Sequence, residues 1–399
     1  MIKDKLLLAT ISLGHASTHW YLAAFYLILP YLSQDFQLSY SQVGAIVAAR
    51  SLVAATANIP SGAIADIFGR KRLMLAIAVI WPAVFYILLG FSPEYGLVLF
   101  FAALVGFGNS LWHPPAMSIL SERFPERRGF ALSMHETGAN LGDFLAPIAV
   151  GFLMTFLTWR FTLFANVPPA IILLVLVWIS VSDERLGKKA RLSLRQYGGA
   201  LRTMFTNRVL LGLSVISATR TMGQNALHTF LPIYLAYEVG LSPATIGLYV
   251  GMLTFASLFT GPVMGTVSDR TGRKPILLSG LLLSSILMAS LGVSRSGIPF
   301  LSALVLLGFF LFSMRPVIFA HALDVTPRDV GSTTTSFLFA MNTAFSAISP
   351  VIAGMIADRA GLVYAFYFSG GLVLIAFLTT IFIPSRTTTP TPQEAPTAP

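Results

Sequence analysis

Long apolar stretches, separated by short polar segments, make up most of this chain. A helix that crosses a lipid bilayer needs roughly 20 mostly apolar residues. Two sets of six such stretches occur, at about 5–32, 40–64, 72–92, 96–121, 129–156 and 160–181, and at about 209–237, 243–267, 275–293, 297–323, 330–356 and 362–383. The pattern predicts an all-α membrane protein with twelve transmembrane helices in two bundles.

The polar segments divide the chain into four parts. Residues 1–182 and 209–384 are predicted to form the N-terminal and C-terminal six-helix bundles. Residues 183–208 carry nine charged side chains and are expected to form a cytoplasmic linker. Residues 385–399 are rich in Pro and Thr, a composition typical of a disordered tail.

Composition supports a membrane protein and narrows its chemistry. Only 11% of residues are charged and 55% are hydrophobic, whereas a soluble domain carries about a quarter charged residues. The sequence has no cysteine, which excludes disulfides, thiol catalysis and cysteine-ligated metals. It contains no nucleotide-cradling glycine motif, so we do not expect an enzyme or a bound cofactor. The apolar run near Met1 is too long for a signal-peptide core, and we expect a retained first helix.

The net charge of +10 follows the predicted topology. With the N-terminus inside, 20 of the 26 Lys and Arg lie in cytoplasmic segments, whereas the outer loops hold only Arg160, Arg295 and Arg359. This bias predicts a protein of the bacterial inner membrane with both termini cytoplasmic. The positive charge is therefore a topology signal, and we expect no nucleic-acid partner.

A Gly-x-x-x-Asp-x-x-Gly-Arg segment occurs twice, each time between two apolar stretches. Opposite charges at such a turn can latch helix ends together in one conformation and release them in another. The alternative is that the cations only enforce topology. The predicted gating residues are Gly62, Asp66, Gly69, Arg70 and Arg72 in the first copy, and Gly265, Asp269, Gly272, Arg273 and Lys274 in the second.

The repeat extends into the helices. At an offset of 202 residues, His113-Pro114 corresponds to Arg315-Pro316, and Asn140 corresponds to Asn342. Colinear matches of this kind predict two halves with one six-helix fold. In membrane transporters that are built from two such halves, the substrate path lies at the interface between the halves.

The paired loops resemble the signature loop of the major facilitator superfamily, and the resemblance covers essentially the whole chain. Trp112-His113-Pro114, Arg127-Arg128-Gly129 and Gly138-Ala-Asn140-Leu-Gly142 resemble the fosmidomycin-resistance branch of drug efflux proteins, with Pro115 where that branch has a glutamate. The resemblance implies the major facilitator fold, a small-molecule substrate and proton-coupled antiport. We expect a monomer in the lipid bilayer.

Two carboxylates lie deep in an apolar helix. Glu136 and Asp143 are seven residues apart with Asn140 between them, so all three share one helical face. Ionisable groups at membrane depth are expensive and therefore point to function. We expect Glu136 and Asp143 to carry protons during transport and Asn140 to bind substrate. The alternative is a buried polar contact with a neighbouring helix.

Three arginines lie at similar depth. Arg50, Arg220 and Arg315 outnumber the two deep acids, which favours an anionic or zwitterionic substrate. The alternative is an internal ion pair of Arg50 with Glu136 or Asp143.

Histidines add a polar face. His15 and His19 lie one turn apart and precede Trp20, but their spacing demands no third ligand, so we expect no metal site. We expect His15, His19, Trp20, His113, Asn225, His228 and Asn342 to line the substrate path, and His135 and His321 to lie outside it.

The sequence therefore favours a secondary transporter that exports a small organic anion or drug in exchange for protons, the proton being the coupling ion. The first alternative is an importer, a proton symporter or facilitator for a nutrient such as an organic acid. A membrane sensor that transports nothing is the second alternative, disfavoured by the paired gating loops and the five deep charges.

Overall fold

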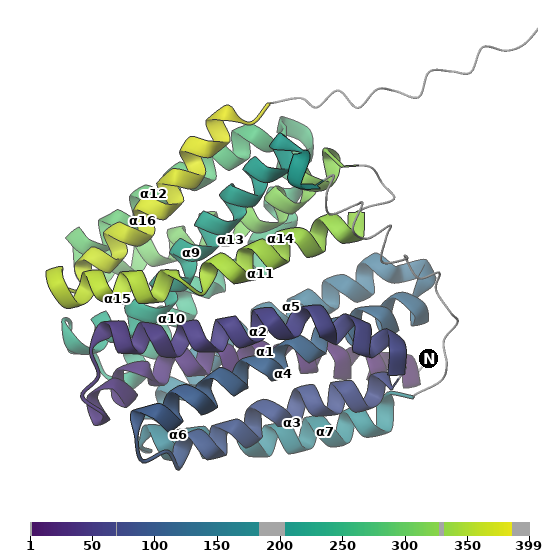
Figure 1. Cartoon of the computed structure of the whole chain (residues 1–399), viewed down its shortest axis with the longest axis horizontal. Helices are drawn as coiled ribbons and strands as arrows, with labels where there is room; N and C mark the ends of the chain where they lie inside the picture. Colours follow the sequence, from purple (N-terminus) through teal and green to yellow (C-terminus); the bar gives the residue numbers. More distant parts are fainter. Residues whose placement is uncertain (1, 69, 183–203, 327–330, 385–399) are drawn as a thin grey trace, which may run out of the picture.

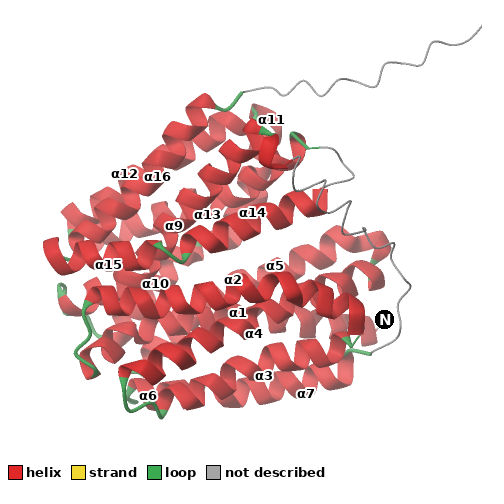
Figure 2. Cartoon of the chain, in the orientation of Figure 1, coloured by secondary structure: helices red, strands yellow, loops and turns green. Residues whose placement is uncertain are grey.

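The computed structural model describes residues 2–68, 70–182, 204–326 and 331–384; within them, the side chains of 2, 58–60, 62–68, 261–262, 331–333 and 336 are not described. Most of the predicted linker and the whole predicted tail lie outside the described residues. Every regular element in the described part is a helix, and short loops join them (Figure 2).

Twelve membrane spans account for the described helices, as predicted. The first half holds α1 (Ile2–Asp35), α2 (Tyr40–Phe68), α3 (Lys71–Gly90), α4 (Tyr95–Arg123), the short η1 (Pro125–Arg127), α5 (Arg128–Leu153), α6 (Trp159–Ala165) and α7 (Val167–Ser180). The second half holds α9 (Arg208–Tyr237), α10 (Pro243–Phe255), α11 (Ser257–Thr271), α12 (Arg273–Ser294), α13 (Gly297–Asp324), α14 (Gly331–Ser346), α15 (Ser349–Ala360) and α16 (Val363–Phe382).

Three spans that the sequence predicts as continuous are interrupted: α6 with α7, α10 with α11, and α14 with α15. Proline lies in the first turn of α7 and of α15, where its missing N–H cannot continue the preceding helix. Between α10 and α11, the Ser257 hydroxyl donates to the carbonyl of Thr254 and thereby competes with the backbone ladder.

Hydrophobicity is distributed unevenly among the spans. Eight of them are long and apolar enough to cross a membrane by length and composition alone, whereas α1, α2, α5 and α9 are not among these eight. Arg50, Asp143 and Arg220 lie on three of those four helices. A helix can be this polar only where one of its faces is turned away from lipid.

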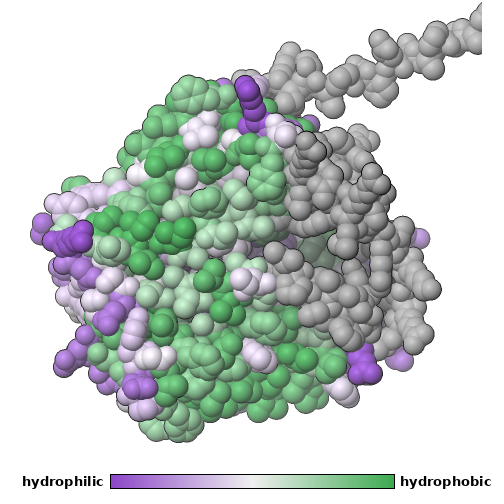
Figure 3. Space-filling model, in the orientation of Figure 1, coloured by the Kyte–Doolittle hydropathy of each residue, from purple (hydrophilic) through white to green (hydrophobic). Residues whose placement is uncertain are grey.

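The outer surface faces lipid. Large apolar side chains such as Phe152, Ile179 and Phe382 are well exposed. Figure 3 shows hydrophobic side chains covering most of the visible face, with hydrophilic ones gathered toward its edges. This is the distribution expected of a protein whose middle is embedded in a bilayer.

The two halves meet along two seams, α2 with α15 and α5 with α10 (Figure 1). Glycines let the backbones approach closely: a Cβ on Gly44 or Gly354 would collide with the facing backbone of α15 or α2, and one on Gly151 or Gly247 with that of α10 or α5. Gly247 lies 203 residues after Gly44, and Gly354 lies 203 residues after Gly151. The same pair of positions, once in each repeat, therefore forms both seams.

Candidate functional site

A cavity of about 790 Å³ lies between the halves. Helices α1, α2, α4 and α5, with Pro82 of α3, form its wall in the first half, and α9, α10, α11, α13 and α14 form its wall in the second. Nine of the thirteen residues predicted to bind substrate or carry protons line it: His19, Arg50, Glu136, Asn140, Asp143, Arg220, Asn225, His228 and Arg315.

The cavity is closed on one side of the membrane. We call the side of the membrane where α1 begins the N-terminal side. The side where α1 ends and α2 begins is called the opposite side. Asp358 at the end of α15 accepts hydrogen bonds from the backbone N–H groups of Tyr40 and Ser41 across the seam, at 2.7 and 3.0 Å. The Tyr237 hydroxyl contacts Ser33, also on the opposite side.

Further hydrogen bonds between the halves extend from the middle of the membrane toward the opposite side. They include those of Tyr26, deep in α1, and of Asp143 in α5. The cavity is therefore sealed on the opposite side by both seams.

The acidic face of α5 forms part of the wall. Glu136, Asn140 and Asp143 all line the cavity, as their spacing predicts. Asp143 accepts a hydrogen bond from His19 Nδ1 at 2.9 Å, and its backbone carbonyl accepts one from Thr254 of the other half at 3.0 Å. Glu136 is more exposed, with its carboxylate 4.0 Å from His135 Nδ1.

Glycines on α5 make the contact between Asp143 and α1 possible. A Cβ on Gly138 would collide with the backbone carbonyl of Ser12, and one on Gly142 with that of Ala16. Small residues four apart let two helices pack with their backbones in contact. The short separation of α1 and α5 brings His19 within hydrogen-bond distance of Asp143.

The three predicted arginines lie in the cavity wall without a carboxylate partner among the described residues. Arg50 Nη2 donates to the Tyr26 hydroxyl at 3.1 Å, and its guanidinium lies 5.0 Å from the centre of the Phe25 ring. An ion pair of Arg50 with Glu136 or Asp143, the alternative raised from the sequence, therefore does not form in the structure.

The second half contributes two of these arginines. Arg220 Nη1 donates to the Leu311 carbonyl at 2.9 Å, and its Nε finds no hydrogen-bond partner in the described part of the chain. Arg315 is exposed to the cavity and lies over the Phe339 ring, with its guanidinium carbon 5.2 Å from the ring centre. The wall thus carries more positive charge than its own acids balance.

A histidine cluster lies behind the wall. His15 is buried; its Nδ1 is 2.8 Å from the His135 carbonyl, and its Nε2 is 3.1 Å from His113 Nε2. The rings of His15 and His135 stack at 3.8 Å, and Trp112 Nε1 donates to His135 Nε2 at 3.2 Å. His15 and His113 do not themselves line the cavity, whereas their neighbour His19 does.

Two further predicted residues are placed elsewhere. Trp20 turns toward the break between α6 and α7, where its indole N–H donates to Asn166 Oδ1 at 2.5 Å. Asn342 is buried beside the cavity, and its Oδ1 has no hydrogen-bond partner in the residues that the structure describes. Neither belongs to the cavity lining.

Sequence reasoning missed Tyr26, whereas His135 lies outside the cavity lining, as expected. Tyr26 joins Arg50 to the second half, because its hydroxyl donates to Asn225 Oδ1 at 2.5 Å. Its spacing of seven residues from His19 puts both on one face of α1, a signal that the sequence contained. His135 precedes Gly138 by three residues and lies on the α5 face that packs on α1.

Comparison with known families identifies the architecture. The family model described as Major Facilitator Superfamily matches residues 11–234 and again 213–399, so it covers nearly the whole chain in two overlapping copies. The chain belongs to the major facilitator superfamily. It is therefore a multi-pass membrane transporter and not an enzyme, as the sequence indicated.

Several relatives within the superfamily match along most of their length. The fosmidomycin resistance protein of Escherichia coli is 24% identical over 389 residues, covering 95% of this chain and 93% of the relative. A probable 4-methylmuconolactone transporter of Cupriavidus pinatubonensis is 26% identical over 382 residues, covering 92% and 87%. A bacterial homologue of the human lysosomal transporter Spinster, solved in an inward-facing occupied conformation, has a TM-score of 0.82 at 16% identity and covers 96% and 97%.

The second copy of the facilitator signature loop forms an ion-pair cluster. Asp269 lies in the last turn of α11, Gly272 has the positive φ of 93° that favours glycine, and Arg273 begins α12. Arg273 pairs with Asp269 and also with Asp324, whose carboxylate at the end of α13 is 3.1 Å away. The next residue, Lys274, donates to the Ile381 carbonyl at 2.8 Å. Gly265, the first predicted residue of this copy, lies on α11.

The first copy makes a comparable contact. Lys71 at the start of α3 pairs with Glu122 at the end of α4 at 2.9 Å, and Glu122 lies 202 residues before Asp324. Arg70 is exposed, and Arg72 lies over the Trp178 ring at 4.7 Å. Gly69, the surroundings of Gly62 and the side chain of Asp66 lie outside the described part of the structure. The Lys71–Glu122 and Arg273–Asp324 pairs each join two helices of the same half, so these loops brace each half internally in this conformation.

Proposed function

We propose that this major facilitator transporter moves a small organic anion through the central cavity by alternating access, coupled to proton movement, and that it works as an exporter. In such a cycle the halves rock about a central site, and each substrate or proton shifts the balance between two conformations. We further propose a monomer in the bacterial inner membrane with both termini cytoplasmic.

The observation that carries the anionic substrate is the charge of the cavity wall. Arg50, Arg220 and Arg315 line it without carboxylate partners among the described residues, while Asp143 is engaged by His19. A buried guanidinium without a counter-charge is costly, and a carboxylate or phosphonate can satisfy it with two parallel hydrogen bonds. Arg50 belongs to the first half and Arg220 and Arg315 to the second, so both halves contribute positive charge to the wall.

Relatives provide independent support for the substrate class. The curated relatives include a probable sulfoacetate transporter of Cupriavidus necator and a hexuronate transporter of Bacillus subtilis, whose names denote anions. Export is favoured by the fosmidomycin resistance protein and by a multidrug resistance protein of Klebsiella pneumoniae. The relatives named for metabolites favour uptake of an organic acid as the second candidate function.

Proton coupling is proposed at Asp143. Its side chain bonds α1 through His19, while its backbone carbonyl bonds α10 of the other half through Thr254. Protonation of the carboxylate would weaken its attraction to His19 at a position that belongs to the α5–α10 seam. A proton taken up here would therefore alter the contact that must separate when the cavity opens to the opposite side. Glu136, which faces the cavity more openly, is the second proton-carrying candidate.

Binding of anions tests the substrate class directly. Purified protein in detergent would be screened by thermal shift against carboxylates, phosphonates and sulfonates, with neutral and cationic drugs as comparison. Arg315→Ala should weaken binding of the best anion by about tenfold or more, because a charge-assisted hydrogen bond contributes about 1.5–3 kcal/mol. Arg295→Ala, which removes the same charge from an exposed loop, should leave binding unchanged. Equal affinity of wild type and Arg315→Ala across the anion panel would refute the proposal.

Inside-out and right-side-out vesicles separate the two directions. An exporter that exchanges substrate for protons accumulates substrate in inside-out vesicles when an imposed gradient drives protons out of them. A proton symporter that imports accumulates substrate in right-side-out vesicles when the imposed gradient drives protons inward.

A further inference from the structure

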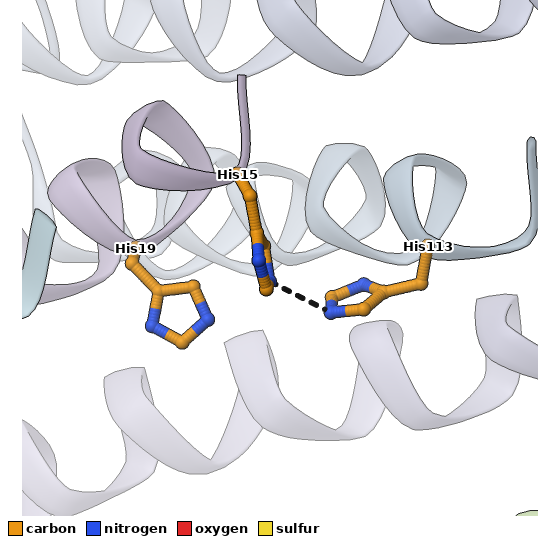
Figure 4. Close-up of side chains that lie close together, drawn as sticks. All are labelled: His15, His19 and His113. Carbon is orange, nitrogen blue, oxygen red and sulfur yellow. Dashed lines mark hydrogen bonds between the residues drawn. The ribbon is translucent and has the colours of Figure 1, made fainter. Parts of the chain in front are cut away.

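Three histidines from two helices converge beside the cavity. His15 and His19 lie one turn apart on α1, and α4 supplies His113. Figure 4 shows the three rings next to one another, with His15 between His19 and His113. One ring nitrogen from each lies within 4.8 Å of the other two. The fold thus supplies the third imidazole that the spacing on α1 could not reveal.

The hydrogen bonds of the outer nitrogens fix which inner nitrogens carry lone pairs. His15 Nδ1 lies 2.8 Å from the His135 carbonyl, and a carbonyl only accepts, so this nitrogen carries the proton. His19 Nδ1 is 2.9 Å from Asp143 Oδ2 and likewise donates to a carboxylate. In their neutral forms both rings therefore present a bare Nε2. Histidine ligands of metals almost always have such a carbonyl or carboxylate behind them.

We propose that Nε2 of His15, Nε2 of His19 and a ring nitrogen of His113 bind one transition-metal dication of the Zn²⁺ class, with the fourth position open to the cavity. Zinc–nitrogen bonds of about 2.0–2.1 Å place tetrahedral ligand nitrogens about 3.3 Å apart. His15 Nε2 and His113 Nε2 are already 3.1 Å apart. His19 needs to approach them by about 1–1.5 Å, a movement within reach of side-chain rotation.

The surroundings suit such a site. Gly138 and Gly142 hold α5 against α1, which keeps the His135 carbonyl and Asp143 behind the ligands. His19 lines the cavity and gives a dissolved ion a route to the buried His15. Asp143 and Glu136 supply negative charge nearby, while Arg315 faces the cavity from the other half.

A simple hydrogen bond between His15 and His113 is the competing explanation of their 3.1 Å contact. The two explanations make different demands on His19: a hydrogen-bonded pair needs only two rings, whereas a metal needs the third. The two explanations also make different demands on Asp143. Its carboxylate orients His19, which a metal site needs, but it does not touch the pair of His15 and His113.

Metal binding to the full chain in detergent tests the site. The purification tag would be removed, the protein treated with chelator, and Zn²⁺ binding measured by equilibrium dialysis, with Co²⁺ absorption reporting the coordination number. We expect one Zn²⁺ per chain and the visible bands of four-coordinate Co²⁺. His19→Gln and His113→Gln should each weaken binding by at least tenfold, and Asp143→Asn by about 10–100-fold, the usual effect of losing a carboxylate behind a ligand.

His228→Gln is the matched control, because it removes a cavity histidine from the opposite half, and it should bind Zn²⁺ like the wild type. Unchanged elution and thermal unfolding would confirm that each variant is folded. The proposal is overturned if folded wild type binds no more Zn²⁺ than His113→Gln, or if His19→Gln binds as tightly as the wild type. Because this readout is binding alone, it stands apart from the transport proposal.

Discussion

Gly151→Ala should shift the protein away from the conformation described here. Gly151 lies on the α5–α10 seam, where an added Cβ would come closer than 3.0 Å to the carbonyl oxygen of Pro243. Neither partner at this contact is a flexible side chain that can swing aside, so the two helices have to separate.

The size of the effect follows from the packing. Inserting a methyl group into a well-packed contact costs about 1–3 kcal/mol. Alternating access requires the seam to separate when the cavity opens to the opposite side, so the cost applies to the present conformation alone. A bias of about 1–3 kcal/mol changes the ratio of two conformations by about 5–150-fold.

Because the chain has no cysteine, spin labels can be attached at introduced cysteines without first removing native ones. Spin labels at Phe156→Cys and Tyr364→Cys report the separation of the halves, since both residues are exposed and flank the opposite side. Distance distributions from pulsed electron paramagnetic resonance should gain a longer component in Gly151→Ala. Gly371→Ala adds the same methyl group in α16, where nothing lies within 4 Å, and should match the wild type. A folded Gly151→Ala protein with the wild-type distribution would refute the role of the seam.

Three other substitutions test the contact between the halves at Asp358, the ion pair of Arg273 with Asp324, and the contact of Trp20 with Asn166. Asp358→Asn weakens the cap on the start of α2, worth about 0.5–2 kcal/mol, and should lengthen the same label distances; an unchanged distribution would argue against a gate. Asp324→Asn removes one partner of Arg273, both partly exposed, so it should change the unfolding free energy by less than about 1 kcal/mol while slowing transport; large destabilisation at normal rate would mean a purely structural brace. Trp20→Phe should lower thermal stability, because Asn166 loses its indole donor, yet leave anion affinity unchanged; weaker binding would return Trp20 to the site.

Much of the architecture was readable from the sequence, because helix periodicity and the duplicated loop are local patterns. The spacing of Glu136, Asn140 and Asp143 placed all three on one wall of the cavity, as the structure has them. The breaks within three spans escaped prediction, since an apolar stretch looks continuous whether or not a proline or a serine interrupts its hydrogen-bond ladder.

The partners of the site residues could not be predicted. His15 and His113 are 98 residues apart, and their contact exists only through the packing of α1 on α4. Trp20 adjoins His19 in the chain, but neighbouring residues on a helix point about 100° apart, so Trp20 faces Asn166 while His19 faces the cavity. Sequence neighbours were a poor guide here, and helical faces were a better one.

Proton-driven flux in proteoliposomes tests the central claim most directly. Wild-type protein with the anion chosen by thermal shift would be given an imposed pH gradient, and substrate movement would be compared with Asp143→Asn and Glu136→Gln. The account predicts gradient-driven transport in the wild type and its loss in Asp143→Asn, with exchange of labelled for unlabelled substrate retained at equal pH. Gradient-driven transport that persists in both variants would contradict proton coupling through α5.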